Sequence, residues 1–211
     1  MARSKSSKRW LDEHFGDEYV KLSQEDGYRS RASYKLLEID KRDKLFRGCK
    51  RALDLGSAPG GWSQVAAQRL QKQLCAGDSV VVASDILPMD PIAGVDFVQG
   101  DFTEELTYQA ILELAGNRRF DLVLSDMAPN MSGIAEIDQP ASMYLIELAL
   151  EMGKEMLAKD GSFLVKAFQG EGFDAYLADV RSSFKRVVIR KPDSSRARSR
   201  EVYILGQGFR C

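Results

Sequence analysis

Short apolar runs alternate with longer amphipathic stretches over most of the chain. The runs that predict strands cover residues 51–55, 79–84, 95–99, 120–125, 162–168, 186–190 and 201–206. The stretches that predict helices cover residues 30–40, 62–73, 103–115, 140–157 and 173–184. This alternation predicts an α/β fold in which a parallel sheet is built through right-handed crossovers.

The last two predicted strands depart from this alternation. Only residues 191–200 join them, and this Ser/Arg-rich connection is too short to hold a crossover helix. We therefore expect these strands to pair antiparallel as a hairpin. The helix predicted over 140–157 is apolar on almost every side, which favours a core helix over a partner surface.

Length and composition indicate one soluble domain. A chain of 211 residues can bury the core of a single α/β domain, which we assign to residues 29–211, after a basic N-terminal arm and lead-in segment over 1–28. No apolar run approaches the roughly 18 residues of a membrane span. Three cysteines without metal or redox spacing, and one histidine, His14, predict no metal site and fit a reducing cytosol. We expect a cytoplasmic monomer without membrane contact, since no exposed apolar stripe is apparent.

Charge is unevenly distributed although the net charge is only −1. Residues 1–50 carry 13 Lys/Arg against 9 Asp/Glu, and residues 181–200 carry 8 against 1. Residues 51–180 carry 8 against 20. An acidic pocket suits a cationic ligand, and basic flanks suit a phosphate backbone if both ends meet on one face. Ordinary solvated surface explains the same charges equally well.

A glycine turn follows the first predicted strand. Residues 54–62 read Asp-Leu-Gly-Ser-Ala-Pro-Gly-Gly-Trp and lead into a predicted helix. Glycines there let a ligand approach the backbone, and the helix start supplies free N–H groups. The spacing differs from the G-x-G-x-x-G of dinucleotide sites, which disfavours NAD.

Together with Asp85 and the tripeptide Gly-Asp-Phe at 100–102, this turn resembles the cofactor site of S-adenosylmethionine methyltransferases. Its Ala-Pro-Gly-Gly-Trp form is similar to that of the FtsJ (RlmE) family of RNA ribose 2'-O-methyltransferases. The resemblance implies a Rossmann-like class I methyltransferase fold, with a mostly parallel seven-stranded sheet of order 3-2-1-4-5-7-6 and helices on both faces. S-adenosylmethionine is then the expected cofactor.

Three acidic residues come at or after the ends of predicted strands, where α/β sheets bind their ligands. They are Asp85, Asp101 and Asp126. The family resemblance implies that Asp85 binds the cofactor ribose, Asp101 the adenine amino edge and Asp126 the methionine end. It also implies that Gly60 and Trp62 contact the cofactor.

A lysine interrupts the otherwise apolar strand predicted over 162–168. Burying Lys166 is costly unless it is paired, so it either points past the sheet into water or serves as a catalytic amine. Lys35, Asp126, Lys166 and Glu201 match the catalytic tetrad of the FtsJ family, which implies Lys166 as the proton acceptor. Lys35 favours a neutral Lys166 and the two carboxylates oppose it, so its protonation state stays open.

Basic and aromatic residues near this tetrad are candidates for RNA contacts. They are Arg29, Arg31, Tyr34, Arg196, Arg198 and Arg200, with Trp10 as a further stacking candidate. The resemblance implies a uridine ribose in the A-loop of 23S ribosomal RNA as target, within the 50S particle. The alternatives are a transfer RNA ribose 2'-O-methyltransferase, a small-molecule methyltransferase, or a catalytically silent RNA-binding assembly factor.

Overall fold

A seven-stranded mixed sheet forms the centre of the computed structural model, which describes residues 17–210. Its order is β3-β2-β1-β4-β5-β7-β6, as predicted. The strands are β1 Arg51–Leu55, β2 Val80–Asp85, β3 Asp96–Gln99, β4 Phe120–Ser125, β5 Leu157–Phe168, β6 Phe184–Arg190 and β7 Glu201–Phe209. Strand β7 runs antiparallel to both β5 and β6, which confirms the predicted hairpin.

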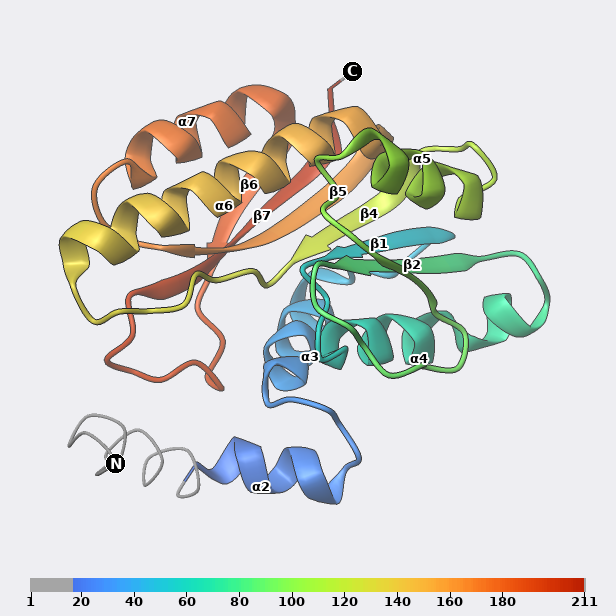
Figure 1. Cartoon of the computed structure of the whole chain (residues 1–211), viewed down its shortest axis with the longest axis horizontal. Helices are drawn as coiled ribbons and strands as arrows, with labels where there is room; N and C mark the ends of the chain where they lie inside the picture. The colour runs from blue at the N-terminus through green and yellow to red at the C-terminus, as the bar shows by residue number, and fades with distance from the viewer. Residues whose placement is uncertain (1–16, 211) are drawn as a thin grey trace.

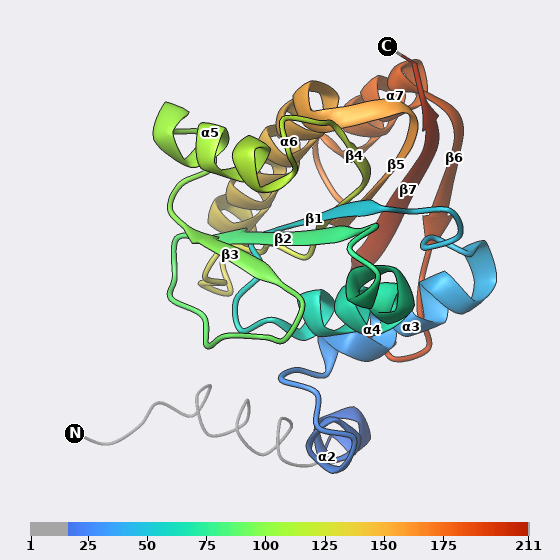
Figure 2. The ribbon, with the colours of Figure 1, turned by 90° about the vertical axis from the view of Figure 1, so that its right-hand side faces the viewer.

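Helices cover both faces of this sheet (Figures 1 and 2). They are α2 Glu18–Glu25, α3 Ala32–Asp43, α4 Gly61–Cys75, α5 Glu105–Leu114, α6 Ala135–Met156 and α7 Phe173–Ser183. Helices α5, α6 and α7 lie above the sheet in Figure 1, and α3 and α4 lie below it. Helix α2 lies below α3, away from the sheet.

The core has two apolar layers, one on each face of the sheet. The larger layer joins the sheet to α5, α6 and α7 and includes Phe120, Ile146 and Phe163. The smaller layer joins the sheet to α3 and α4 and includes Leu36 and Leu70. Because strand side chains alternate between faces, every strand except β3 contributes residues to both layers.

Two predicted boundaries differ clearly from the structure. Helix α6 begins at Ala135, and Pro140 lies inside it, whereas the sequence pattern placed Pro140 at its start. Strand β5 begins at Leu157 rather than at residue 162, because the chain stays paired with β4 through a register shift that includes Asp160 at φ 65°. Helix α2 was not predicted at all.

Candidate active site

Three of the four tetrad residues come from neighbouring strand ends on the α3 face of the sheet. Lys166 in β5 lies directly opposite Tyr203 in β7, and Glu201 lies two residues earlier on the same face as Tyr203. Asp126 directly follows β4, the other neighbour of β5. Helix α3 packs over this face and carries Lys35 toward it.

The structure brings the four residues together as two ion pairs. The Lys35 amine lies 2.7 Å from a carboxylate oxygen of Glu201. The Lys166 amine lies 3.2 Å from a carboxylate oxygen of Asp126 and also donates a hydrogen bond to the Asp126 backbone carbonyl. The Lys166 side chain is only 9% exposed, so it does not extend into water, and its partner accounts for its burial.

Tyr203 joins the two ion pairs, and sequence reasoning missed it. Its hydroxyl lies 2.9 Å from the Asp126 carboxylate and 3.3 Å from the Glu201 carboxylate. The ring is fully buried, 5.7 Å from the Trp62 ring, and the Lys35 amine lies 5.7 Å from its centroid. Burial, followed by the charges of Asp126 and Glu201, raises the pKa of Tyr203 well above its ordinary value. The hydroxyl is therefore a permanent donor to these carboxylates.

Glu201 is held in its charged form. Burial alone would raise its pKa, but the nearby charges of Lys35 and Lys166 and a hydrogen bond from Ser195 lower it below the ordinary value. The Ser195 hydroxyl donates to Glu201 over 2.9 Å. The site therefore presents fixed charges whose positions depend on strands, on α3 and on the connection that contains Ser195.

The glycine turn lies beside this cluster, between β1 and α4. Gly60 has φ 106°, which L side chains rarely adopt, and a Cβ there would lie 2.6 Å from Ile92 and 2.8 Å from Met89. Arg29 fixes this close packing, because its guanidinium donates to the carbonyls of Pro59, Asp90 and Pro91 at 3.1, 2.6 and 2.8 Å. Arg29 therefore ties the turn to segment 86–95.

A small cavity of about 50 Å³ opens between the turn and the tetrad. It is lined by Ser30, Ala32, Asp54, Gly56, Ser57, Ala58, Pro59, Gly61, Trp62 and Asp126. The buried Ser57 hydroxyl has no hydrogen-bond partner among residues 17–210. Burial raises the pKa of the fully buried Asp54 to about 7, although Ser63 donates a hydrogen bond to it over 2.6 Å. An unpaired hydroxyl and a carboxyl that lacks a cation fit the polar, cationic end of a sulfonium cofactor.

The other predicted cofactor residues lie at the same end of the sheet. Asp85 is buried and accepts from the backbone N–H groups of Ala58 and Leu87, both over 2.8 Å. Asp101 is exposed and accepts from the backbone and hydroxyl of Thr103. The Trp62 indole donates to the Ala32 carbonyl over 2.8 Å, so it also fixes the start of α3.

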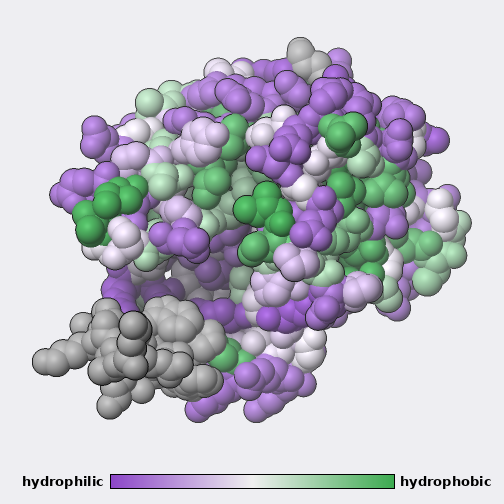
Figure 3. Space-filling view, viewed as in Figure 1, coloured by the Kyte–Doolittle hydropathy of each residue, from purple (hydrophilic) through white to green (hydrophobic). Residues whose placement is uncertain are grey.

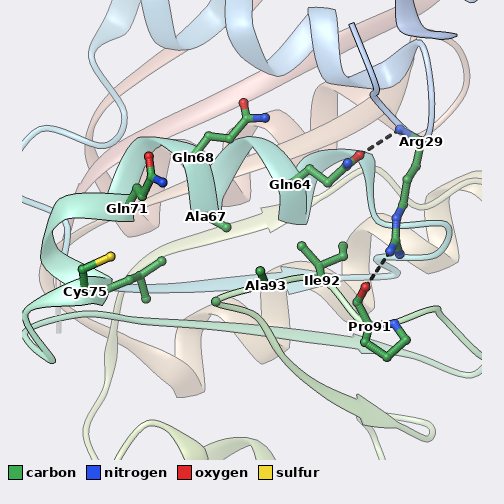
Figure 4. Close-up of a pocket in the computed structure, with 11 residues that line it drawn as sticks. Arg29, Gln64, Ala67, Gln68, Gln71, Cys75, Pro91, Ile92 and Ala93 are labelled. Carbon is green, nitrogen blue, oxygen red and sulfur yellow. Dashed lines mark hydrogen bonds between the residues drawn. The ribbon is translucent and has the colours of Figure 1, made fainter.

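A larger cavity of about 520 Å³ lies on the other side of segment 86–95, away from the tetrad. Helix α4 and residues 91–94 line it, and Arg29 closes one end (Figure 4). In this view Arg29 extends from Gln64, which accepts its backbone N–H, to the Pro91 carbonyl. No residue of the tetrad lines this cavity.

The described parts of the two basic regions, residues 17–50 and 181–200, meet next to the tetrad. Arg31, one turn before Lys35, donates to the Ser194 carbonyl, and Glu38 accepts from the backbone of Asp193 and Ser194. These contacts hold the 191–200 connection against α3.

The predicted RNA-contacting residues differ in their present partners. Arg31 and Arg196 both contact the Asp17 carboxylate, and the Tyr34 hydroxyl donates to Asp26. The side chains of Arg198 and Arg200 are exposed. The Arg29 guanidinium is taken up by backbone carbonyls instead of facing a phosphate. Trp10 and His14 lie outside the described residues.

Metal-ligating side chains do not gather in the described part of the chain: among residues 17–210, no cluster of three His, Cys, Asp or Glu side chains could hold a metal ion. No helix between residues 17 and 210 combines the length and apolarity needed to cross a bilayer.

Comparisons with known proteins agree with this architecture. Two relatives are called Ribosomal RNA large subunit methyltransferase E. The one from Marinobacter nauticus is 61% identical, and the match covers all of this chain and 99% of the relative. The one from Cellvibrio japonicus is 59% identical, and the match covers 99% of this chain and 97% of the relative. A Plasmodium falciparum structure assigned as a ribosomal RNA methyltransferase aligns with a TM-score of 0.73 at 28% identity, over 86% of this chain and 98% of that one.

More distant structures share the fold alone. Human Methyltransferase-like protein 13 in complex with SAH aligns with a TM-score of 0.52 at 16% identity, over 83% of this chain and 79% of that one. The family model for FtsJ-like methyltransferases matches residues 28–209. With this match over nearly the whole chain, and with relatives of about 60% identity, the chain belongs to the FtsJ-like methyltransferase family.

Proposed function

We propose that this protein transfers a methyl group from S-adenosylmethionine to the 2'-hydroxyl of a uridine ribose in large-subunit ribosomal RNA. The target is a uridine of the A-loop of 23S ribosomal RNA. The observation that carries the proposal is the gathering of two amines and two carboxylates around Tyr203, beside the cavity of the glycine turn. The names of the relatives support ribosomal RNA as the substrate.

The residues around the 50 Å³ cavity would hold the cofactor. Asp54, Ser57 and Asp126 supply the polar groups for its methionine end, and Asp85 and Asp101 those for its ribose and adenine. Gly60 and Trp62 shape the turn around it. When bound, S-adenosylmethionine supplies an electrophilic methyl group on a cationic sulfur.

Lys166, in its neutral amine form, receives the proton that the ribose hydroxyl loses. A ribose hydroxyl is a weak nucleophile, so transfer needs in-line placement and a positioned proton acceptor. The Asp126 carbonyl and carboxylate orient the Lys166 amine, and the carboxylate neutralises the ammonium that results. Lys35 and Glu201 would hold the ribose. General-base help of this kind contributes about 10²- to 10⁴-fold.

RNA is bound, in this proposal, by the basic surface around the tetrad. It comprises Arg31, Tyr34, Arg196, Arg198 and Arg200, whereas the guanidinium of Arg29, also a candidate from the sequence, is bound by backbone carbonyls. We further propose that the protein acts in the cytoplasm as a monomer, on the 50S particle, with residues 29–211 as one methyltransferase domain behind a basic lead-in segment.

Mapping of the transferred methyl group tests this function. The protein is incubated with labelled S-adenosylmethionine and, separately, with 50S subunits that lack A-loop methylation, naked ribosomal RNA and transfer RNA. The proposal predicts label on one uridine 2'-oxygen of 23S ribosomal RNA. Label on transfer RNA would favour the transfer RNA enzyme. Label only on small molecules would favour a small-molecule methyltransferase. Binding of RNA without any methyl transfer would favour a catalytically silent assembly factor.

A further inference from the structure

Two arginines next to the tetrad share one carboxylate. Arg31 forms an ion pair with Asp17, and Arg196 approaches the same oxygen of Asp17 at 3.5 Å. The Asp17 side chain is only 10% exposed, and those of Arg31 and Arg196 are 18% and 32% exposed. Three charged groups therefore meet in a partly buried position where a carboxylate oxygen lies between two guanidinium groups.

This arginine pair is held close to the tetrad from both sides. Arg31 stands one helical turn before Lys35, so both side chains lie on one face of α3. Arg196 directly follows Ser195, whose hydroxyl donates to Glu201 over 2.9 Å. The pair thus lies next to the Lys35–Glu201 end of the tetrad, on the two elements that carry these residues or their partners.

A carboxylate and a phosphate offer arginine the same kind of acceptor. Both present anionic oxygens that guanidinium groups bind in fork geometry. In the view of Figure 3, hydrophilic residues cover much of the described surface, with apolar residues between them. The Asp17 oxygen is therefore an acceptor of the same kind as the phosphate oxygens of RNA.

We propose that Asp17 is a placeholder for an RNA phosphate: it holds Arg31 and Arg196 in position and is displaced when RNA binds. The placeholder orders the arginines before binding and lowers affinity, because the phosphate must replace it. This inference rests on the proposed RNA substrate, and it adds a specific phosphate site and a competing residue.

Asp17→Asn separates the charge from the structural role of Asp17. Asp17 is also the N-cap of α2, where its carboxylate accepts the Tyr19 backbone N–H over 3.1 Å. Asparagine caps helices as well as aspartate does, so the substitution keeps the cap. Asp17→Ser, another capping residue without charge, provides a second variant. Glu18→Gln is the matched control, since Glu18 is exposed on the next position of the same helix and its replacement changes the net charge equally.

Binding of naked large-subunit ribosomal RNA to each variant is measured over a series of salt concentrations. We expect Asp17→Asn or Asp17→Ser to bind about threefold to tenfold more tightly than wild type at low salt. The gain in affinity should shrink as the salt concentration rises, because salt screens the charge that Asp17 contributes. Glu18→Gln should stay within twofold of wild type.

The proposal is overturned if neither Asp17 variant binds more tightly than Glu18→Gln, because Asp17 would then serve only to hold α2 and the arginines. Methyl transfer by the wild type to the same RNA is measured in parallel. If the wild type methylates this RNA and the Asp17 variants bind no more tightly, the placeholder fails alone. If the wild type transfers no methyl group to any ribosomal RNA, the proposed function fails instead.

Discussion

Tyr203 is the residue through which the two ion pairs of the site depend on each other. Its hydroxyl contacts Asp126 and Glu201, which belong to different pairs and lie 75 positions apart in the chain. An aromatic residue inside an apolar strand looks like ordinary core in a sequence, because its hydroxyl partners come from other strands. The four charged residues could be recognised from their motifs, but this link required the sheet register.

Tyr203→Phe should lower the turnover number about tenfold, since the two carboxylates lose the buried hydroxyl that lies between them and donates to one of them at a time. Steady-state methyl transfer with large-subunit ribosomal RNA measures this effect. Tyr176→Phe is the matched control, because Tyr176 is also buried and its hydroxyl has no partner among residues 17–210. Equal activity of the two variants would remove Tyr203 from the positioning of the site.

Asp54 shows a different residue-scale effect, a carboxyl kept protonated by burial. Burial raises its pKa to about 7 from an ordinary value of 3.8, with the charges of Asp126 and Asp85 adding to the rise. In the unfolded chain the carboxyl ionises near pH 4, whereas the folded protein holds the proton to about pH 7. Its contribution to stability is therefore complete below about pH 4 and is lost as pH rises toward 7.

The free energy of unfolding of the cofactor-free protein should thus fall by up to about 4 kcal/mol from this group between pH 4 and pH 7. Asp54→Asn removes the titration while keeping a polar side chain beside Ser63. We expect Asp54→Asn to lose this fall in urea unfolding measured across that range. An identical pH dependence in both proteins would mean that Asp54 is already ionised in the folded state.

At the scale of elements, apolar runs predicted all seven strands, but local signals misplaced some boundaries. The apolar pattern predicts a helix that starts at Pro140, whereas α6 begins at Ala135 and holds Pro140 inside it. Helix α2 carries few apolar residues, so the apolar pattern does not predict it. Its Tyr19 packs against Tyr34 of α3 at 5.4 Å between ring centroids, and Tyr28, in the loop after α2, packs against the same ring at 5.7 Å.

Arg29 links two elements of the predicted cofactor site, the glycine turn and segment 86–95. Its three hydrogen bonds to backbone carbonyls require a guanidinium, and a lysine amine cannot reproduce their fork geometry. Arg29→Lys should therefore weaken S-adenosylmethionine binding about fivefold to fiftyfold, measured by calorimetry.

Arg118→Lys provides the control for this substitution. Arg118 is exposed just before β4, at the opposite end of the sheet from the turn, so its replacement should leave cofactor affinity unchanged. If Arg29→Lys binds the cofactor as tightly as Arg118→Lys does, the link between the two segments does not shape the cofactor site.

At the scale of the whole molecule, the mixed sheet brings the two basic ends of the chain to one side of the acidic centre. The uneven charge left open whether the two basic regions meet, and the contacts of Arg31 and Glu38 with the 191–200 connection show that they do. The sequence could not predict that Arg29 binds backbone or that Asp17 lies between two arginines. Such pairings depend on distances that exist only in the folded chain, whereas motif residues can be recognised in short stretches of sequence.

Lys166 is proposed to accept the proton when this assembly transfers a methyl group. Its role is measured by single-turnover methyl transfer with wild type and Lys166→Met on 50S subunits that lack A-loop methylation, with cofactor affinity measured on both proteins. We expect the rate of Lys166→Met to fall by at least about 10²-fold, with cofactor affinity within about threefold of wild type. Transfer by Lys166→Met at a rate near that of wild type would rule out Lys166 as the proton acceptor.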